Sequence, residues 1–305
     1  MEKRTVLYML DPMPHNSPFD INMAIDANYD VVLPINNVKL EEINGLTQDA
    51  IFSRGPQGTK NTGMFIGGRD IGLAMQMMDA ARKAMVPPFQ VSIMADPSGG
   101  FTTAAALVAL VERELQQKHG CDLQGLKSVV FGGTGPVGLA TGVIAALCGA
   151  ESTIVDHASL DNALEKATHY SRLFNTQMEG TCAASEADKV HLLHEADVVF
   201  CCARAGVQVL KAPVLAEARK LKVAGDVNAV PPLGIDGIQL KNLGVPLKYA
   251  VSSPGAVGIG ALAIGDFKYK LQHALLKNLL NQEEPLFVDF REAFTEARKL
   301  LARQS

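Results

Sequence analysis

The sequence carries little net charge and no concentrated charge of either sign. Its 305 residues have a formal net charge of −4, and no run of five or more like charges occurs. Proteins that bind nucleic acid or anionic membranes attract them through basic tracts or strongly positive fields. The sequence therefore predicts neither nucleic acid nor a membrane surface as a partner.

Cysteine is scarce as well. The chain holds five cysteines at irregular spacing and without a C-x-x-C pair, namely Cys121, Cys148, Cys182, Cys201 and Cys202. An odd number without regular spacing excludes a complete disulfide framework and is not a metal-ligand pattern. These residues are typical of reduced thiols in the core of a cytoplasmic protein, and no metal site is predicted.

Long apolar runs are also missing. The first apolar stretch ends at Asp11-Pro12 and is too short for the core of a secretory signal or for a membrane span. Hydrophobic residues nevertheless make up 48% of the chain and charged residues only 20%. A chain of this length and composition can bury a large core and fill two domains, so we expect a globular cytoplasmic protein.

The most informative motif is a glycine-rich turn. Residues 128–131 predict a buried parallel strand, and residues 136–148 predict a helix. Gly133, Gly135 and Gly138 fit G-x-G-x-x-G, in which the first glycine allows the tight turn, the second lets backbone approach a pyrophosphate, and the third lets helix and strand pack closely. The pattern predicts a dinucleotide site made by Gly133, Thr134, Gly135, Pro136, Val137 and Gly138, with a turn that binds no ligand as the alternative.

An acidic residue follows the next predicted strand, residues 152–155. Asp156 comes eighteen positions after Gly138, where a carboxylate accepts hydrogen bonds from the ribose 2′-hydroxyl of the cofactor. A 2′-phosphate would meet Asp156 as a like charge, so the pattern favours NAD. NADP stays open because the next residue, His157, could turn toward a phosphate. The alternative role of Asp156 is to cap the helix predicted over residues 160–174.

Strand and helix patterns alternate in both halves of the chain, which is typical of α/β domains. In the first half, strands are predicted over residues 5–10, 31–35, 50–52, 64–66 and 89–94, with helical patterns between them. We predict two α/β domains with a cleft between them. The substrate domain spans residues 1–122, a Rossmann-type dinucleotide-binding domain spans 123–262, and C-terminal helices over 263–305 cross back to the first domain.

Further candidates follow the predicted carboxyl ends of strands, where open α/β sheets bind ligands. Ala203 begins a turn of small residues that would let backbone approach the cofactor. Asn228 is placed to bind the nicotinamide carboxamide, although asparagine also forms turns in such loops. In the first domain, one strand-to-helix turn and the start of its helix hold Asp96, Ser98, Thr102 and Thr103.

Several separated segments carry a family resemblance over essentially the whole chain. They include Phe19-Asp20, Arg54-Gly55, residues 64–68, 102–106, 133–138 and 228–234, and residues 258–260 with the helix that contains Lys268-Tyr269-Lys270. Together they resemble the methylene-tetrahydromethanopterin dehydrogenases of methylotrophic bacteria, which are relatives of the methylene-tetrahydrofolate dehydrogenases.

The resemblance implies a hydride transfer in one-carbon (formaldehyde) oxidation. The hydride leaves the methylene carbon of methylene-tetrahydromethanopterin for C4 of the nicotinamide of NAD, or of NADP, and a methenyl cation remains. This step moves no proton on a heteroatom and needs no general base, which agrees with the absence of a nucleophile and histidine constellation. The resemblance also leads us to expect a homo-oligomer with a pterin as its small-molecule substrate.

The resemblance further implies catalytic roles for Phe19, Asp20, Lys268 and Gln272. Phe19 would pack on the pterin ring, and Lys268 would make a polar contact near the reacting carbon, with Gln272 one helical turn further on. Some relatives carry histidine where Gln272 aligns. Taken alone, these residues also fit a buried phenylalanine, a capping aspartate and a solvated lysine. Arg54 could reach the acidic side arm of the substrate, or lie on the surface.

Two other functions stay open, and a third is disfavoured by a missing motif. A methylene-tetrahydrofolate dehydrogenase is the nearest, although the first domain lacks the Tyr-x-x-x-Lys motif of the bifunctional folate enzymes. Shikimate-type dehydrogenases share the two-domain plan, but their Asn-x-Thr-x-Pro-x-Lys motif is missing. A non-catalytic NAD-binding sensor would show nucleotide binding without turnover.

Overall fold

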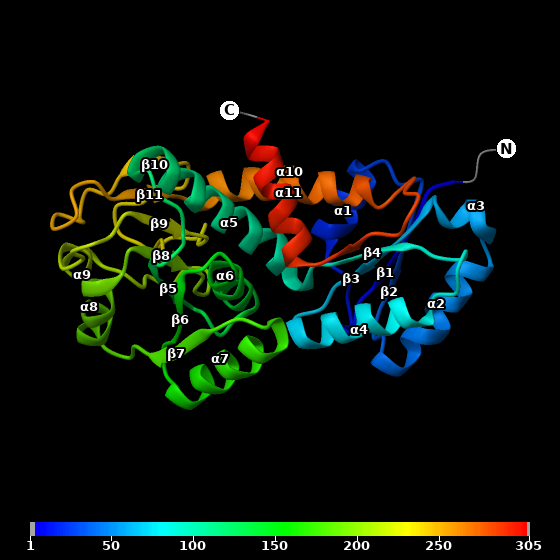
Figure 1. The fold of residues 1–305 in the computed structure, drawn as a ribbon, viewed down its shortest axis with the longest axis horizontal. Coiled ribbons are helices and arrows are strands. Elements are labelled where there is room, and N and C mark those ends of the chain that lie inside the picture. Colours follow the sequence, from blue (N-terminus) through cyan, green and yellow to red (C-terminus); the bar gives the residue numbers. More distant parts are fainter. Residues whose placement is uncertain (1–3, 304–305) are drawn as a thin grey trace. The chain divides into compact units, whose positions relative to one another are not determined.

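The computed structural model describes residues 4–303 and contains two compact units, each built on a sheet of its own (Figure 1). The first unit comprises the chain up to Thr102 together with Tyr269–Leu300, and the second comprises Thr103–Lys268 and the residues from 301 on. The chain changes unit inside helix α5 (Gly100–Glu114) and inside helix α10 (Ala261–Asn278), at other positions than the boundaries predicted after residues 122 and 262.

The sheet of the first unit has five strands, all paired in parallel, in the order β12-β4-β3-β1-β2. Their bounds are Val6–Leu10 (β1), Val31–Ile35 (β2), Thr62–Ile66 (β3), Ser92–Ala95 (β4) and Phe287–Val288 (β12). Strands β3 and β4 are buried along their whole length, as continuous apolar runs in parallel sheets are. The strand order reverses between β1 and β3, which makes their carboxyl ends the topological switch point where such sheets bind ligands.

The helices of the first unit include α1 (Pro18–Asp26), α2 (Ile43–Phe52), α3 (Gly55–Thr59), α4 (Ile71–Ala84) and most of α11 (Phe290–Ala302). The strand predicted over residues 50–52 is wrong, because these residues form the last turn of α2. Ile43, Thr47 and Ala50 are buried along one side of this helix. A three-residue apolar run does not distinguish a strand from the end of an amphipathic helix.

The sheet of the second unit has seven strands in the order β10-β11-β9-β8-β5-β6-β7. Their bounds are Lys127–Phe131 (β5), Glu151–Asp156 (β6), Met178–Cys182 (β7), Val198–Cys201 (β8), Val223–Asp226 (β9), Leu243–Pro246 (β10) and Val257–Ile259 (β11). Only β10 runs antiparallel to its neighbour among these pairs. From β7 to β11 the order is that of a dinucleotide-binding sheet, with its switch point between β5 and β8.

The helices that flank this sheet include α6 (Pro136–Leu147), α7 (Leu160–Phe174), α8 (Glu186–Glu195) and α9 (Ala212–Ala216), and Leu107 of α5 packs against Gly225 of β9. Figure 1 shows α8 and α9 on the opposite face of the sheet from α6 and α7. One core packs Val129, Phe131 and Val199 of the strands against Leu193 of α8 and Leu215 of α9. The prediction of two α/β domains, the second of Rossmann type, is therefore confirmed. Within residues 4–303, no helix combines the length and the apolar character that crossing a bilayer requires.

Candidate dinucleotide and substrate sites

The glycine-rich loop after β5 is packed tightly against its neighbours. The left-handed residue of the turn is Gly132, with φ 70°, and Gly133 follows it in the same turn. A Cβ atom on Gly132 would lie 2.6 Å from backbone atoms of Cys202 and Ala203. At Gly133 it would lie 2.6 Å from Cβ of Ile154, and at Gly138 it would lie 2.2 Å from the carbonyl oxygen of Gly132. These three glycines are needed for backbone packing.

Gly135 has a different role from the other glycines of the loop. It is the N-cap of α6, with φ −85° and ψ 168°, a conformation open to any residue. A Cβ atom there would have only one neighbour within 4 Å, the Gly132 carbonyl oxygen at 3.6 Å. Pro136 follows at the first helical position, and the free N–H groups of the first turn of α6 are donors for an anion. The loop thus keeps a side-chain-free space beside a helix N-terminus.

The carboxylate of Asp156 joins this loop to the segment that follows β6. Its Oδ1 accepts hydrogen bonds from the backbone N–H of Ala158 (2.9 Å) and Ser159 (3.1 Å). Its Oδ2 accepts from Oγ1 of Thr134 (3.0 Å) and from Nδ2 of Asn162 (2.6 Å). Burial by itself raises the pKa of Asp156, but the four hydrogen bonds outweigh it and lower the pKa to about 2. The N-cap of α7 is Ser159 rather than Asp156.

Two basic side chains contact Asp156 or its hydrogen-bond partner Thr134. Nδ1 of His157 is 3.6 Å from Oδ1 of Asp156, and the His157 side chain is 95% exposed. Lys166, on α7, donates a hydrogen bond of 2.6 Å from Nζ to the carbonyl oxygen of Thr134. Sequence reasoning missed Lys166. The available signal was its spacing from Asn162, since residues four apart on a helix share a face.

The loops after β8 and β9 hold the remaining two cofactor candidates. Ala203 follows β8, with its backbone against Gly132. Asn228 is 2% exposed, and its Oδ1 accepts from the N–H of Gly206 (3.0 Å) and of Val230 (2.9 Å), while Nδ2 donates to the carbonyl oxygen of Pro232 (2.8 Å). The structure therefore shows the Asn228 side chain holding together the loops that follow β8 and β9.

In the first unit, the switch point is formed by Asp11 after β1 and by Gly67 and Gly68 after β3. A Cβ atom on Gly67 would lie 2.5 Å from Oδ2 of Asp11, so a side chain at this position would displace that carboxylate. Asp11 is 5% exposed and accepts a hydrogen bond from the N–H of Met13 (2.8 Å). Burial, together with the nearby Asp20, raises the pKa of Asp11. Sequence reasoning missed Asp11, although its place directly after a predicted strand was a usable signal.

Three of the four catalytic candidates, Phe19, Asp20 and Gln272, belong to the first unit. Ser17 caps α1 through the N–H of Asp20, and Phe19 beside it is 48% exposed. The buried carboxylate of Asp20 accepts a 2.7 Å hydrogen bond from Nε2 of Gln272 on α10. The structure thus brings Asp20 and Gln272 together. Lys268, one turn earlier on α10, is 8% exposed and is not a solvated lysine.

The turn after β4 is organised by Asp96. This fully buried carboxylate accepts hydrogen bonds from the N–H of Phe101 (2.8 Å) and Thr102 (3.1 Å) and from Oγ1 of Thr102 (2.6 Å). Ser98 has a left-handed backbone, φ 56°, and its Oγ donates to the carbonyl oxygen of Gly68 (3.1 Å). Ser98 therefore lies at the switch point, whereas Asp96 and Thr102 hold the start of α5 in place. Thr103 is half-buried in α5.

Arg54 is not brought together with the other candidates of the first unit. Its Nε donates to Oγ1 of Thr62 (3.1 Å), and its Nη2 donates to the carbonyl oxygen of Arg4. Thr62 begins β3, and Arg4 lies just before β1. Arg54 therefore lies at the amino ends of these parallel strands, the opposite edge from Asp11 and Gly67.

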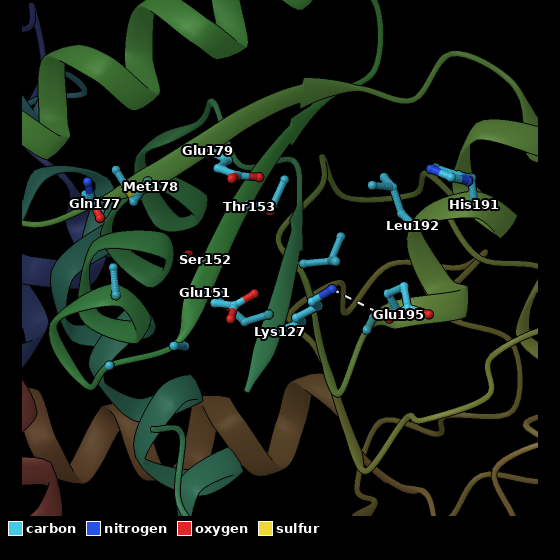
Figure 2. Close-up of a pocket in the computed structure, with 16 residues that line it drawn as sticks. Lys127, Glu151, Ser152, Thr153, Gln177, Met178, Glu179, His191, Leu192 and Glu195 are labelled. Atoms are coloured by element: carbon cyan, nitrogen blue, oxygen red, sulfur yellow. Dashed lines mark ion pairs between the residues drawn. The ribbon is translucent and has the colours of Figure 1, made fainter. Parts of the chain in front are cut away.

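A hollow of about 820 Å³ in the second unit lies away from all these residues (Figure 2). It is lined by the first residues of three strands, including Lys127 of β5, Glu151 of β6 and Met178 of β7, and by α8. Figure 2 shows Lys127 directed toward Glu195, with 3.5 Å between Nζ and the carboxylate. This edge of the sheet is opposite the glycine loop, and none of the predicted site residues lines the hollow.

Comparison with known proteins assigns the chain. Residues 18–98 match the family model described as "Methylene-tetrahydromethanopterin dehydrogenase, N-terminal". An "NAD(P)-dependent methylenetetrahydromethanopterin dehydrogenase" from Methylorubrum extorquens (strain AM1) is 43% identical over 95% of this chain and 97% of its own length. The chain belongs to the methylene-tetrahydromethanopterin dehydrogenase family. The resemblance found in the sequence motifs is thereby confirmed.

Two further proteins are similar to this chain, one in sequence and one in fold. The "Bifunctional protein MdtA" of the same organism is 30% identical over 97% of the chain and 99% of its own length. The structure of shikimate 5-dehydrogenase from Listeria monocytogenes, solved with shikimate and NAD, aligns with a TM-score of 0.54 over 98% of this chain and 96% of that one. At 13% identity, this last similarity shows the fold alone.

Two substitutions in the glycine loop of this chain should have opposite effects. Gly135→Val should abolish NAD binding and leave the melting temperature nearly unchanged, because the new side chain would fill the open space at the α6 N-terminus. Gly138→Val should instead lower the melting temperature or prevent folding, since its Cβ would overlap the Gly132 carbonyl. Calorimetric NAD titration and thermal melting test both variants. Wild-type NAD affinity in a folded Gly135→Val protein would contradict this placement of the cofactor.

The low pKa of Asp156 yields a prediction about acid stability. Because this pKa is about 2 in the folded protein against an ordinary 3.8, the ionised carboxylate stabilises the fold above about pH 4 and loses that effect as the pH falls toward 2. Asp156→Asn should cost about 2 kcal/mol at neutral pH. Urea unfolding should show the gap to wild type narrowing below about pH 4. Asp161→Asn, an exposed change in the first turn of α7, serves as the control, and a gap independent of pH would refute the prediction.

Proposed function

We propose that this protein oxidises methylene-tetrahydromethanopterin to methenyl-tetrahydromethanopterin with a nicotinamide dinucleotide as hydride acceptor. The observation that carries the proposal is the 43% identity to a dehydrogenase of that name along nearly the whole of both chains. The fold supports it, because each unit presents its own switch point with residues suited to one of the two reactants. The activity would make the protein an oxidoreductase of one-carbon metabolism.

The second unit suits the dinucleotide. Gly135 leaves room for a pyrophosphate, and the first N–H groups of α6 can donate to it. Asp156 holds Thr134 and the start of α7 in fixed positions around the place of the adenosine ribose. Ala203 and the loop fixed by Asn228 lie at the ends of β8 and β9, on the nicotinamide side in sheets of this topology. When bound, the nicotinamide supplies the hydride acceptor.

The first unit suits a reduced pterin. Phe19 offers an exposed aromatic face, and Asp20 and Gln272 form a buried polar pair on two helices. Oxidation of the methylene group leaves a delocalised cation, so a fixed carboxylate near the ring stabilises the transition state more than the ground state. Ser98 provides a hydroxyl at the switch point, beside Gly67 and Gly68. The chemistry needs positioned rings rather than a general base.

Turnover with two carriers tests the proposal. Purified protein with methylene-tetrahydromethanopterin should reduce NAD or NADP, which is measured as absorbance at about 340 nm by the reduced nicotinamide. Methylene-tetrahydrofolate should give at least tenfold lower kcat/KM, the scale of losing one well-placed contact to the carrier. A preference for the folate would replace the proposed carrier. Nicotinamide nucleotide binding without turnover of either carrier would indicate a sensor protein instead.

Lys268 provides a residue-level prediction. We assign it a donor role toward a carbonyl of the pterin, since an ammonium aimed at the reacting carbon would oppose the cation that forms there. Lys268→Ala should lower kcat/KM for the pterin substrate by roughly tenfold to a thousandfold, while NAD affinity stays the same. The pH profile of wild type should be flat across neutrality.

The matched control for this variant is Lys270→Ala, which removes an exposed lysine from the same helix. It should keep wild-type kinetics. Equal kinetics of Lys268→Ala and wild type would instead show that Lys268 contributes only to the structure of α10.

A further inference from the structure

The adenosine end of the dinucleotide site is less acidic than its sequence suggests. A carboxylate has about four acceptor positions, and Asp156 uses all four on protein donors. The charge of Asp156 is therefore shared among two backbone N–H groups, a hydroxyl and an amide. Such a carboxylate repels a neighbouring phosphate less than one that faces the ligand directly, and it binds ribose hydroxyls only by exchanging one of these partners.

A cation lies in the same cluster of hydrogen bonds. Thr134 joins the two groups, because its hydroxyl donates to Asp156 while its carbonyl oxygen accepts from the ammonium of Lys166 at 2.6 Å. Asn162 and Lys166 are one turn apart on α7 and both reach back to this cluster. Within residues 4–303, no carboxylate lies within 4 Å of Nζ of Lys166, and the bond to Thr134 uses one of its three hydrogens.

In dinucleotide-binding sheets the 2′ position of the adenosine ribose lies beside the residue that ends the second strand, here Asp156. A 2′-phosphate at that position would lie next to the Asp156–Thr134–Lys166 cluster. The ammonium of Lys166 has two hydrogens left for it, and His157 on the adjacent exposed turn could approach it from solvent. Phosphate bound by such a cation makes charge-assisted hydrogen bonds.

We infer that Lys166 is the residue that admits the 2′-phosphate, so that the protein takes NADP as well as NAD. This inference rests on the proposed use of a nicotinamide dinucleotide, and it adds which residue lets the site accept the 2′-phosphate of NADP. The role is one of recognition, since Lys166 is assigned no contact with the reacting atoms.

Direct binding of reduced cofactors tests the inference without the pterin. Nicotinamide fluorescence titrations give the Kd of NADPH and of NADH for wild type, Lys166→Met and Lys166→Arg. Methionine keeps much of the apolar stem and removes the charge, and arginine keeps the charge. Lys166→Met should raise the Kd of NADPH by ~10- to 100-fold and that of NADH by less than about threefold, whereas Lys166→Arg should retain most of the NADPH affinity.

The control is Lys127→Met, which removes the same charge from the opposite edge of the same sheet and should change neither Kd. Competition by 2′,5′-ADP should weaken in Lys166→Met, and competition by 5′-AMP should not. Equal weakening of NADPH and NADH would overturn the inference and leave Lys166 as a support of the glycine loop. Unchanged affinities, or a wild type that binds NADH but not NADPH, would also overturn it. Binding of neither cofactor to wild type would instead remove the proposed function.

Discussion

The hydrogen bonds of the Asp156 carboxylate are the interaction on which the nucleotide-binding unit depends. They connect the end of β6 and the beginning of α7, which follow one another in the chain, to the glycine loop after β5, which precedes α6 and β6 in the sequence. Without that carboxylate the donors would lose a buried partner, which is costly in a protein interior. A single side chain thus sets the geometry of the loop and, in the proposed dinucleotide site, the charge at the adenosine end. Removing it would change both at once.

The two units place different groups at the same kind of position. In each, the strand order reverses beside β1 or β5, and the loops that leave the neighbouring strands diverge there. The second unit fills that position with glycine and a helix N-terminus, which suit phosphate. The first fills it with Asp11, glycine backbone and the hydroxyl of Ser98, which suit the amide-like edges of a heterocycle. The two switch points thus differ in the residues that they carry, although the topology around them is the same.

The sequence predicted best the features carried by local patterns. The glycine spacing located the tight turn between β5 and α6, and alternating strand and helix patterns predicted both α/β domains, because backbone sterics and amphipathic periodicity act over few residues. The motif alone did not show that Gly132, one position before it, takes the positive φ of the turn. The helix end at residues 50–52 was misread because the run is too short to show a period. Both points concern ambiguity within a few residues.

The features that sequence reasoning missed or left open depend on neighbours far along the chain. Asp11 matters because β3 lies beside β1, and Lys166 matters because the turn of α7 directs it to Thr134. The engagement of Asn228 with Gly206 and Pro232 likewise needed the packed loops. The pairing of Asp20 with Gln272 joins residues 252 positions apart, and only the family resemblance placed both in one site. Tertiary contacts of this kind leave no periodic trace in the sequence.

The late position of β12 in the chain has a consequence for synthesis. This strand pairs with β4 at the edge of the first sheet, and the hydroxyl of Tyr29 bonds to the carbonyl oxygen of Leu276, so the unit that begins the chain is completed by residues translated near its end. On the ribosome, the second unit has all its strands before the first does, and the early strands must wait with one edge uncovered. The segment matched by the family model, residues 18–98, lacks both β1 and β12 and is therefore a fragment of a folding unit rather than a unit in itself.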